Sequence, residues 1–321
     1  MRKRRRFTVI EGQKTKSKRP KIQSLILLTL ALLVVRIAWP FAHQALAAIF
    51  VRTVNAQIGV LEHIVEAPGF IVRQEQVVTA PLTGTLKWLA ADGERLAIGA
   101  PVATITTAGG TVQTVTMPAA GMVIKKIDGF EGALQPVILE QPAALDVAQL
   151  SEAKADLQEV DDGAEVQQGS FIFKSINNYL WYYVAQFKHD AFAALEGKTT
   201  VDLRLSLDDS ATVRAQIREV IEEEGTVTAV FALQEQLAGC YEERFAEVEI
   251  VTQRTRGIVL PTSALRVRGD ETGVYVLDQS LVRYRKVEVV TTEAQQVVVH
   301  GLPTGIPVII NPVFVKEGQK L

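Results

Sequence analysis

Four histidines are the side chains of this sequence most suited to proton transfer or metal binding. They lie far apart, and no two have the i, i+4 spacing that presents a pair of metal ligands on one helix face. His189 precedes Asp190, a combination that could serve acid–base catalysis, but no nucleophile motif lies nearby. We therefore expect no catalytic residue and no metal site. The four expected surface histidines are His43, His63, His189 and His300.

The other reactive groups also favour a protein without a chemical step. Cys240 is the only cysteine, which excludes an intrachain disulfide and any site built from several thiolates, and we expect an inert thiol. Residues 222–224 are three glutamates before Gly225, which predicts a solvated turn, with a patch for a cation or a partner as the alternative. No Walker-type loop occurs, and we expect no cofactor.

Residues 179–183 form the densest aromatic segment of the chain. Four of these five side chains are Tyr or Trp. The first interpretation is a barrel strand with rings on both faces. The second is a recognition surface, because exposed aromatic rings favour binding.

Charge divides the chain into two parts. Ten of the 34 basic residues but only one of the 36 acidic residues lie in the first 21 positions. The remaining 300 residues therefore hold 24 basic against 35 acidic side chains. Nucleic-acid binding by this part is disfavoured, because phosphate affinity needs a basic surface.

An apolar segment follows the basic cluster. Residues 22–42 contain one charge, Arg36, and are long enough to cross a bilayer as a helix. Trp39 suits the interfacial aromatic belt, and the preceding basic residues predict a cytoplasmic N-terminus. A cleaved signal peptide is the competing interpretation, because residues 25–35 resemble its apolar core and Ala45 and Ala47 its cleavage site. Both interpretations place the rest of the chain outside the cytoplasm.

From about residue 66 the sequence has the pattern of a mainly β protein. Short β-branched runs, such as 112–117 and 226–233, alternate with glycine turns. Helical patterning is rare: residues 143–157 are the best candidate, and 190–196 could form a second short helix.

An internal repeat organises the first β region. A Pro-x-x-Gly turn is followed by a strand and an Asp-Gly turn, with a second glycine six residues later, and this order occurs twice. The glycines lie where turns need positive φ or where two backbones approach closely. Each half leaves one face to bury, so the two halves must interlock. The repeat consists of Pro81, Gly84, Gly93 and Gly99 in one half, and Pro118, Gly121, Gly163 and Gly169 in the other.

This doubled motif resembles the lipoyl-like barrel-sandwich hybrid of biotinyl and lipoyl carriers and of HlyD-type membrane fusion proteins, the periplasmic adaptors. Carriers have a modified lysine in the hairpin between the halves, but residues 106–111 contain no lysine. The C-terminal segments 257–265 and 301–309 are similar to "V-V-P-x-x-A-L" and "G-L-x-x-G-x-x-V-I" segments of adaptors. The resemblance therefore implies an adaptor rather than a carrier.

The expected organisation follows from these patterns and the resemblance. The fold class is mainly β: a transmembrane helix, a lipoyl-like barrel-sandwich hybrid, a β-barrel and a membrane-proximal-like C-terminal β module. The ranges are a basic tail at 1–21, the span at 22–42, a linker at 43–65, the hybrid at 66–175 with a helical insertion near 143–157, the barrel at 176–255 and the C-terminal module at 256–321.

Many adaptors insert a long α-helical hairpin between the two lipoyl-like halves. Here the interval between Ile105 and Met117 is too short for two long helices, at 1.5 Å per residue. The resemblance implies a non-enzymatic subunit of an efflux or secretion transporter, held on the cytoplasmic membrane by one span. Its implied partners are an inner-membrane permease or ATPase-driven exporter and further copies of itself. The alternative is a structural or interaction protein of the cell envelope built from the same modules.

Overall fold

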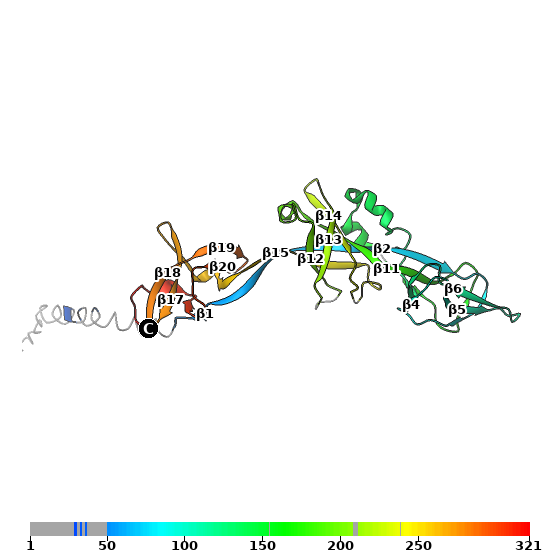
Figure 1. The fold of residues 1–321 in the computed structure, drawn as a ribbon, viewed down its shortest axis with the longest axis horizontal. Helices are drawn as coiled ribbons and strands as arrows, with labels where there is room; N and C mark the ends of the chain where they lie inside the picture. Colours follow the sequence, from blue (N-terminus) through cyan, green and yellow to red (C-terminus); the bar gives the residue numbers. More distant parts are fainter. Residues whose placement is uncertain are drawn as a thin grey trace, which may run out of the picture. The chain divides into compact units, whose positions relative to one another are not determined.

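The chain is built mainly of β-strands, as the sequence predicted (Figure 1). The computed structural model describes residues 29, 30, 33 and 36 and residues 50–321, with gaps at 154, 208–210 and 238. Within these residues no helix is both long and apolar enough to cross a membrane. The predicted basic tail and membrane span lie outside the described part, apart from the four isolated positions.

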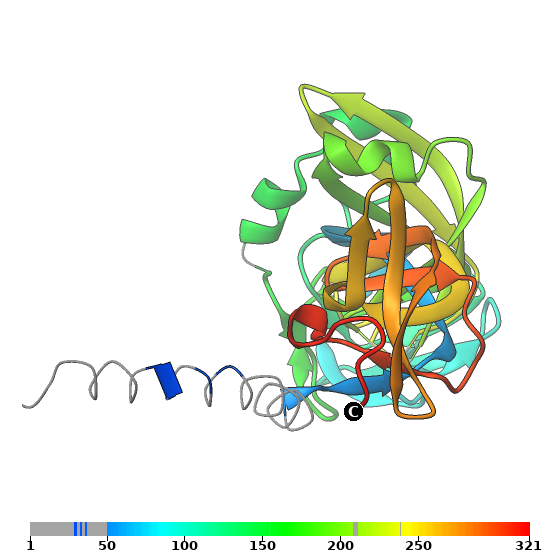
Figure 2. The same cartoon turned by 90° about the vertical axis from the view of Figure 1, so that its left-hand side faces the viewer.

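The described chain divides into two compact units. One comprises Val60–Thr255, and the other combines residues 50–59 with Arg256–Leu321. The second unit (orange to red in Figures 1 and 2) is an antiparallel β module with core residues such as Val274, Val276 and Val308. Its strands are β1 (Thr53–Asn55), β16 (Leu265–Arg268), β17 (Glu271–Asp278), β18 (Leu281–Lys286), β19 (Glu288–Glu293), β20 (Gln296–His300) and β21 (Pro307–Ile309), with 3₁₀ turns η4 (Thr262–Ala264) and η5 (Pro312–Phe314).

The predicted linker at 43–65 is wrong for its second half. β1 pairs with β21. The buried Ala56 accepts a backbone hydrogen bond from the Gly305 N–H and donates one to the Ile306 carbonyl. The next strand, β2 (Gln57–Thr79), begins immediately afterwards. These residues are therefore part of the folded β structure, because their backbone groups complete sheets formed with later strands.

The first half of the larger unit is an interlocked pair of repeats. Its strands form two four-membered sets with the same arrangement, β10-β3-β5-β6 and β4-β7-β11-β2. Each set takes its short first strand from the opposite half of the repeat, so neither half can close its sheet alone. The strands are β3 (Gly84–Trp88), β4 (Arg95–Leu96), β5 (Pro101–Thr106), β6 (Val112–Thr116), β7 (Gly121–Ile124), β8 (Lys126–Ile127), β9 (Gln158–Glu159), β10 (Glu165–Val166) and β11 (Phe171–Lys188).

The second half of the larger unit is a closed β-barrel. The order β15-β12-β13-β14-β11-β2 is closed by pairing of β2 with β15. Trp181, Tyr183 and Phe231 are buried in its core, which a barrel fills with inward-facing side chains. The strands not yet bounded are β12 (Thr200–Leu205), β13 (Val213–Glu223), β14 (Thr226–Leu233) and β15 (Phe245–Pro261), with the 3₁₀ turn η3 (His189–Ala194) after β11.

The barrel includes residues near the N-terminal limit of the expected hybrid, so the expected limits of these two domains are wrong there. Val65, which was expected in the linker, and Ala67 and Ile71, which were expected in the hybrid, pack in the core of the barrel. The reason is that β2 and β11 are long strands that pass through both domains. A single sheet ladder therefore connects the two domains without a flexible linker.

The insertion in the second repeat contains less helix than the sequence predicted. Instead of a helix over 143–157, it has two 3₁₀ turns, η1 (Pro136–Glu140) and η2 (Pro142–Ala144), and one short helix, α2 (Val147–Glu152). The carboxylate of Asp146 accepts a hydrogen bond from the Gln149 N–H at 2.9 Å and caps α2, so the helix begins after it. Phe130, Leu134 and Val147 of this insertion pack on the barrel.

Candidate functional site: the junction of hybrid and barrel

In each half of the repeat, the glycine of the Asp-Gly turn and the glycine six residues after it have a left-handed backbone conformation. Gly93 and Gly163 have φ of +72° and +82°, and Gly99 and Gly169 have +78° and +86°. Each donates its N–H to the opposite half of the hybrid, which is how the two halves interlock. The acceptors are the carbonyls of Val123 for Gly93, Leu86 for Gly163, Met117 for Gly99 and Ala80 for Gly169, at 2.8–2.9 Å.

The other two glycines of the repeat are required by close backbone approach. A Cβ on Gly84 would lie 2.4 Å from the Thr106 carbonyl oxygen, and one on Gly121 would lie 2.3 Å from that of Ile176. Pro81 and Pro118 lie in the equivalent bends that precede these glycines. The eight residues thus define the crossings between the two halves and shape the hybrid domain.

A cluster of six buried charges lies where the hybrid, its insertion and the barrel meet. All six side chains are at most 8% exposed. The cations and anions are equal in number, so the cluster has no net formal charge. Its members are Arg73 and Glu75 on β2, Asp128 and Glu131 of the insertion, Lys174 on β11 and Arg244 just before β15.

Arg244 and Lys174 connect the carboxylates of this cluster. The Arg244 Nη2 atom lies 2.8 Å from Glu75 Oε2 and 2.9 Å from Asp128 Oδ2. The Lys174 ammonium lies 2.9 Å from Glu131 Oε1 and 3.6 Å from Asp128 Oδ2. Charge-assisted bonds of this kind are the stronger hydrogen bonds of proteins, and here they connect three parts of the chain in the interior.

Arg73 joins the cluster to the loop that enters the barrel. Its guanidinium bonds to the Glu75 carboxylate and to the carbonyl oxygen of Cys240. The Glu131 carboxylate also accepts the N–H groups of Asp128 and Gly129, at 2.8 and 3.0 Å. The cluster therefore organises backbone segments as well as side chains.

Glu75 and Asp128 hold their charge in spite of burial. Burial alone raises the pKa of Glu75, but the charges of Arg73, Arg244 and Lys174 together outweigh it and hold this pKa below its usual range. Burial likewise raises the pKa of Asp128, but Arg244, Lys174 and the Phe130 N–H outweigh it and hold this pKa below its usual value. Burial alone lowers the pKa of Arg244, but Glu75 and Asp128 outweigh this effect, so that its pKa lies above the usual value.

We expect the stability of the junction to depend on pH only in acid. A carboxyl group with a lowered folded-state pKa stabilises the fold above its unfolded pKa, about 4.3 for Glu and 3.9 for Asp, and this stabilisation is lost as the pH falls further. The cluster's contribution to the free energy of unfolding should be constant from pH 8 to about 5 and decrease below about pH 4. Denaturant unfolding of the wild type and of Glu75→Gln at several pH values measures it, and parallel pH profiles would contradict the role of Glu75.

This cluster was not predicted from the sequence. Its members come from four separated segments, and no short motif joins them. One signal was available: Lys174 interrupts the apolar run at 171–176, and Arg73 follows the apolar run at 70–72. A charge inside a buried strand requires a partner, although the sequence does not say which one.

The aromatic segment on β11 agrees with the barrel-strand interpretation. Trp181 and Tyr183 are buried, and they donate to the carbonyls of Glu235 at 2.9 Å and Ala246 at 2.5 Å. Burial raises the pKa of Tyr183 far above its usual value, so the phenol stays protonated. Tyr179 is exposed, and the Arg95 guanidinium of the hybrid lies 4.4 Å from its ring centre. This contact crosses the same junction on the outside.

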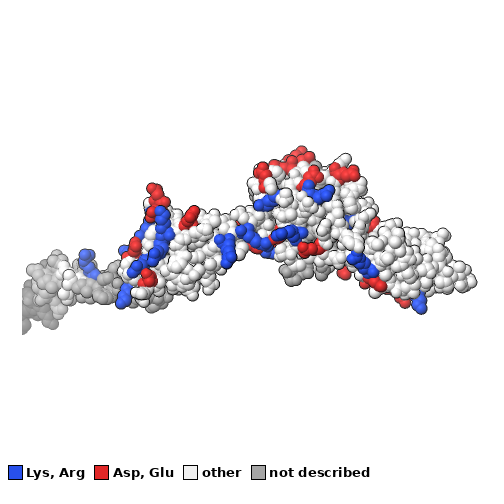
Figure 3. Space-filling view, viewed as in Figure 1, with Lys and Arg blue, Asp and Glu red and all other residues white. Residues whose placement is uncertain are grey.

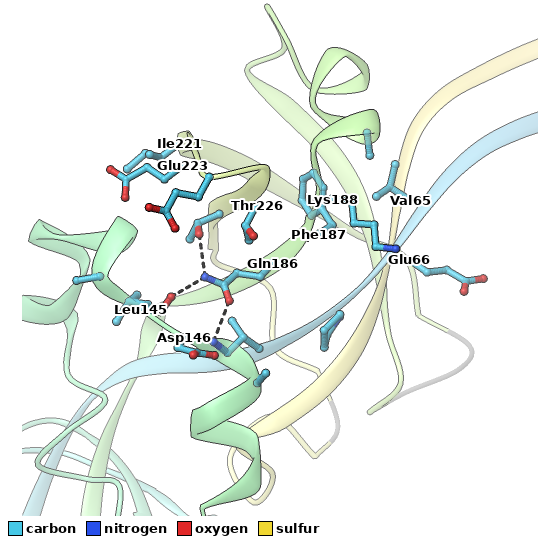
Figure 4. Close-up of a pocket in the computed structure, with 17 residues that line it drawn as sticks. Val65, Glu66, Leu145, Asp146, Gln186, Phe187, Lys188, Ile221, Glu223 and Thr226 are labelled. Atoms are coloured by element: carbon cyan, nitrogen blue, oxygen red, sulfur yellow. Dashed lines mark hydrogen bonds between the residues drawn. The ribbon is translucent and has the colours of Figure 1, made fainter.

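A hollow with a volume of about 850 Å³ lies between the barrel and the insertion (Figure 4). Gln186 lies at its base and donates to the Leu145 carbonyl at 2.5 Å and to Thr228 Oγ1 at 2.9 Å. Its Oε1 atom accepts the Val147 N–H at 2.9 Å. Because these polar groups already bond to one another, Gln186 fastens the insertion to the barrel.

The residues first considered for chemistry are dispersed. His63, His189 and His300 are exposed, and His43 lies outside the described residues. Cys240 is buried, and burial raises its thiol pKa. The predicted glutamate turn is a tight hairpin in which Glu224 and Gly225 have positive φ. Among the described residues no three His, Cys, Asp or Glu side chains are grouped to hold a metal.

His189 should be dispensable. Its Nδ1 atom lies 2.6 Å from the Glu222 carboxylate, in an exposed contact that stabilises by at most about 1 kcal/mol. We expect His189→Ala to leave the melting temperature of the purified chain almost unchanged. A large fall in the melting temperature would contradict an exposed, weakly stabilising pair.

Comparisons with known proteins identify both domains of the larger unit. A family model for the "RND related, barrel-sandwich hybrid domain" matches residues 75–177, and one for the "RND related, beta-barrel domain" matches residues 181–254. Together these matches cover more than half of the chain. No curated protein matches it significantly.

Solved structures give distant similarities. MacA from Actinobacillus actinomycetemcomitans is 15% identical, with 81% of this chain and 99% of that chain covered and a TM-score of 0.39. ZneB from Cupriavidus metallidurans is 14% identical, with 83% and 94% covered and a TM-score of 0.32. At these values they carry no argument about function.

The order of the two matched domains is the order that the repeat and the strand pattern predicted. Residues 75–177 contain the interlocked halves, and residues 181–254 contain most of the barrel. The expected resemblance is therefore confirmed for both domains: residues 75–177 belong to the RND-related barrel-sandwich hybrid family and residues 181–254 to the RND-related beta-barrel family.

Proposed function

We propose that this protein is an extracytoplasmic adaptor subunit of an efflux or secretion transporter, anchored in the cytoplasmic membrane by residues 22–42. The observation that carries the proposal is the pair of RND-related domains in the expected order. The basic cluster followed by an apolar segment supports the anchor and its orientation. In this role the protein binds and positions its partners and performs no chemical step.

The junction between hybrid and barrel supports a positioning role. Two strands, β2 and β11, continue through both domains, and the six-charge cluster fixes the insertion against them. A rigid connection of this kind transmits the position of one domain to the other. The transporter partner would be a permease or an ATPase-driven exporter, because no Walker-type loop occurs in this chain.

One feature of the hybrid favours the second candidate, an envelope scaffold built from the same modules. β5 and β6 are joined directly by residues 107–111, so the long helical hairpin of many adaptors is absent at this place. Contact with an outer channel through such a hairpin is therefore not part of the proposal. An envelope scaffold would share the fold and the orientation but would not bind a transporter.

Topology is the first test of the proposed role. Protease added to intact protoplasts should digest the domains after residue 50 and spare a tag at the N-terminus. Digestion of the tag with survival of the domains would contradict the orientation. A mature chain that begins near Ala48 would replace the anchor by a cleaved signal peptide. Transporter binding, which separates the two candidate functions, is tested by co-purification as described in the Discussion.

A further inference from the structure

β6 is an open edge of the hybrid domain. It is the outermost strand of the set β10-β3-β5-β6 and pairs only with β5 among the described strands. The Thr107 N–H donates to the Thr111 carbonyl at 2.9 Å, and bonded pairs alternate along an antiparallel ladder. The backbone N–H and C=O groups of Val112, Thr114 and Thr116 therefore point away from β5.

This edge has little of the usual protection against pairing with another strand: β6 carries no charge, and the irregularity in its ladder lies on β5, between Pro101 and Ala103. Proteins commonly place charges, proline or a bulge on exposed edges. No charged residue occurs between Arg95 and Lys125, and the corresponding end of the hybrid lies in the region of Figure 3 with few blue or red atoms. By contrast, the edge strand β18 of the C-terminal unit carries Arg283, Arg285 and Lys286.

The equivalent edge in the other half is occupied at one end, at Glu75, and Val77 on the same strand is 39% exposed. Residues 76–81 on and after β2 read Gln-Val-Val-Thr-Ala-Pro, which matches Gln-Thr-Val-Thr-Met-Pro at 113–118. Beside this β2 edge, the Gln135 side chain of the insertion donates to the Glu75 carbonyl at 2.9 Å. The matching connection of the first half, between β3 and β4, is only a turn and contains no insertion. The insertion therefore contacts one edge of the repeat, at Glu75, and leaves the β6 edge without a matching contact.

We propose that the β6 edge pairs with β6 of a second copy of this chain, in antiparallel orientation about a twofold axis at Thr114. A strand that pairs with its own copy places its residues symmetrically, so any charge near the axis would face a like charge. Val112–Thr116 contains none. The axis places Val112 opposite Thr116 of the partner, which is a favourable pair of β-branched side chains.

The pairing continues the four-stranded set into the second copy. The outward groups at Val112, Thr114 and Thr116 would form about six backbone hydrogen bonds across the axis. The two Thr114 Cα atoms would lie about 5.5 Å apart, as in a bonded antiparallel pair. This inference concerns self-association of the chain and does not depend on the transporter role.

Charge on the edge tests the pairing. For the purified full chain, we expect sedimentation to show self-association that Thr114→Lys weakens about tenfold or more, because two lysines would face each other at the axis. Thr114→Val removes no backbone group and should retain association. Val77→Lys, at the equivalent position of the β2 edge, should retain it as well. A monomeric wild type, or equal association of wild type and Thr114→Lys, would overturn the proposal.

A cysteine at the axis tests the register. In a bonded antiparallel pair the two Cβ atoms lie about 5.5 Å apart, too far for a disulfide but within reach of a short bismaleimide cross-linker. Treating Thr114→Cys with such a reagent should therefore give a covalent dimer, whereas Val77→Cys should give little. The native Cys240 is buried and serves as the background in both variants. Cross-linking of Val77→Cys as fast as that of Thr114→Cys, or no cross-linking at position 114, would overturn the pairing.

Discussion

Replacing Arg244 by alanine should lower the free energy of unfolding by about 3–5 kcal/mol, the usual cost of leaving a buried charge without its partner. Arg244 is buried and bonds to the carboxylates of both Glu75 and Asp128. Removing it leaves two buried carboxylates with fewer cations nearby. Denaturant unfolding of the purified chain measures the change.

Arg214→Ala is the matched control. Arg214 also pairs with a carboxylate, that of Asp202 at 3.4 Å, but its side chain is 72% exposed. An exposed pair contributes at most about 1 kcal/mol, so the control should unfold almost as the wild type does. Equal effects of the two alanine variants would mean that the buried cluster does not stabilise the junction.

Substitutions at Lys174 and Glu131 distinguish the effect of the charge pair from that of side-chain packing. Lys174→Met alone should be strongly destabilising, because it strands the Glu131 carboxylate that lies 2.9 Å from the ammonium. Adding Glu131→Gln should recover part of the loss. The double-mutant cycle reports this coupling, and strictly additive losses would contradict it.

The second large effect is expected at the close crossings of the repeat. Gly84→Ala and Gly121→Ala should each lower the free energy of unfolding by about 2–4 kcal/mol, because the new Cβ would overlap a backbone carbonyl that has little freedom to move. The distances to those oxygens are 2.4 and 2.3 Å. Thermal or denaturant unfolding measures the loss, and transporter binding should decrease with it.

Gly109 provides the control for these substitutions. The atom nearest to a Cβ added at Gly109 would be Thr107 Oγ1, at 3.9 Å, and the φ of Gly109 is not positive. Gly109→Ala should therefore be nearly neutral. If Gly84→Ala were as mild as Gly109→Ala, the two halves would not interlock as described.

The repeat could be predicted from the sequence because its signals are local. Each half has proline and glycine at fixed spacing, and turn geometry depends on residue types a few positions apart. Pro81 and Gly84, with Pro118 and Gly121, were therefore found without the structure. The pairing of short β4 and β10 with opposite halves follows from the need of each half to cover its partner.

The junction could not be predicted because its determinants are distant in sequence. Arg73 and Arg244 are far apart along the chain, yet both contact the Glu75 carboxylate. The helix expected at 143–157 was too long because local helix propensity alone does not set the length of a helix. Asp146 caps a helix of only six residues, and packing on the barrel fixes its length. Long strands such as β2 also concealed the boundary between hybrid and barrel.

The central claim is that this chain works by binding a transporter, and affinity purification tests it most directly. The full-length chain, tagged at the C-terminus, is purified from solubilised cytoplasmic membranes after mild cross-linking, alongside Gly84→Ala as a matched variant with an impaired hybrid domain. We expect one multispanning permease or ATPase-driven exporter to co-elute with the wild type in a fixed ratio and to be reduced with the variant. Recovery of the wild type with envelope proteins but without any transporter would contradict the adaptor role and favour the scaffold.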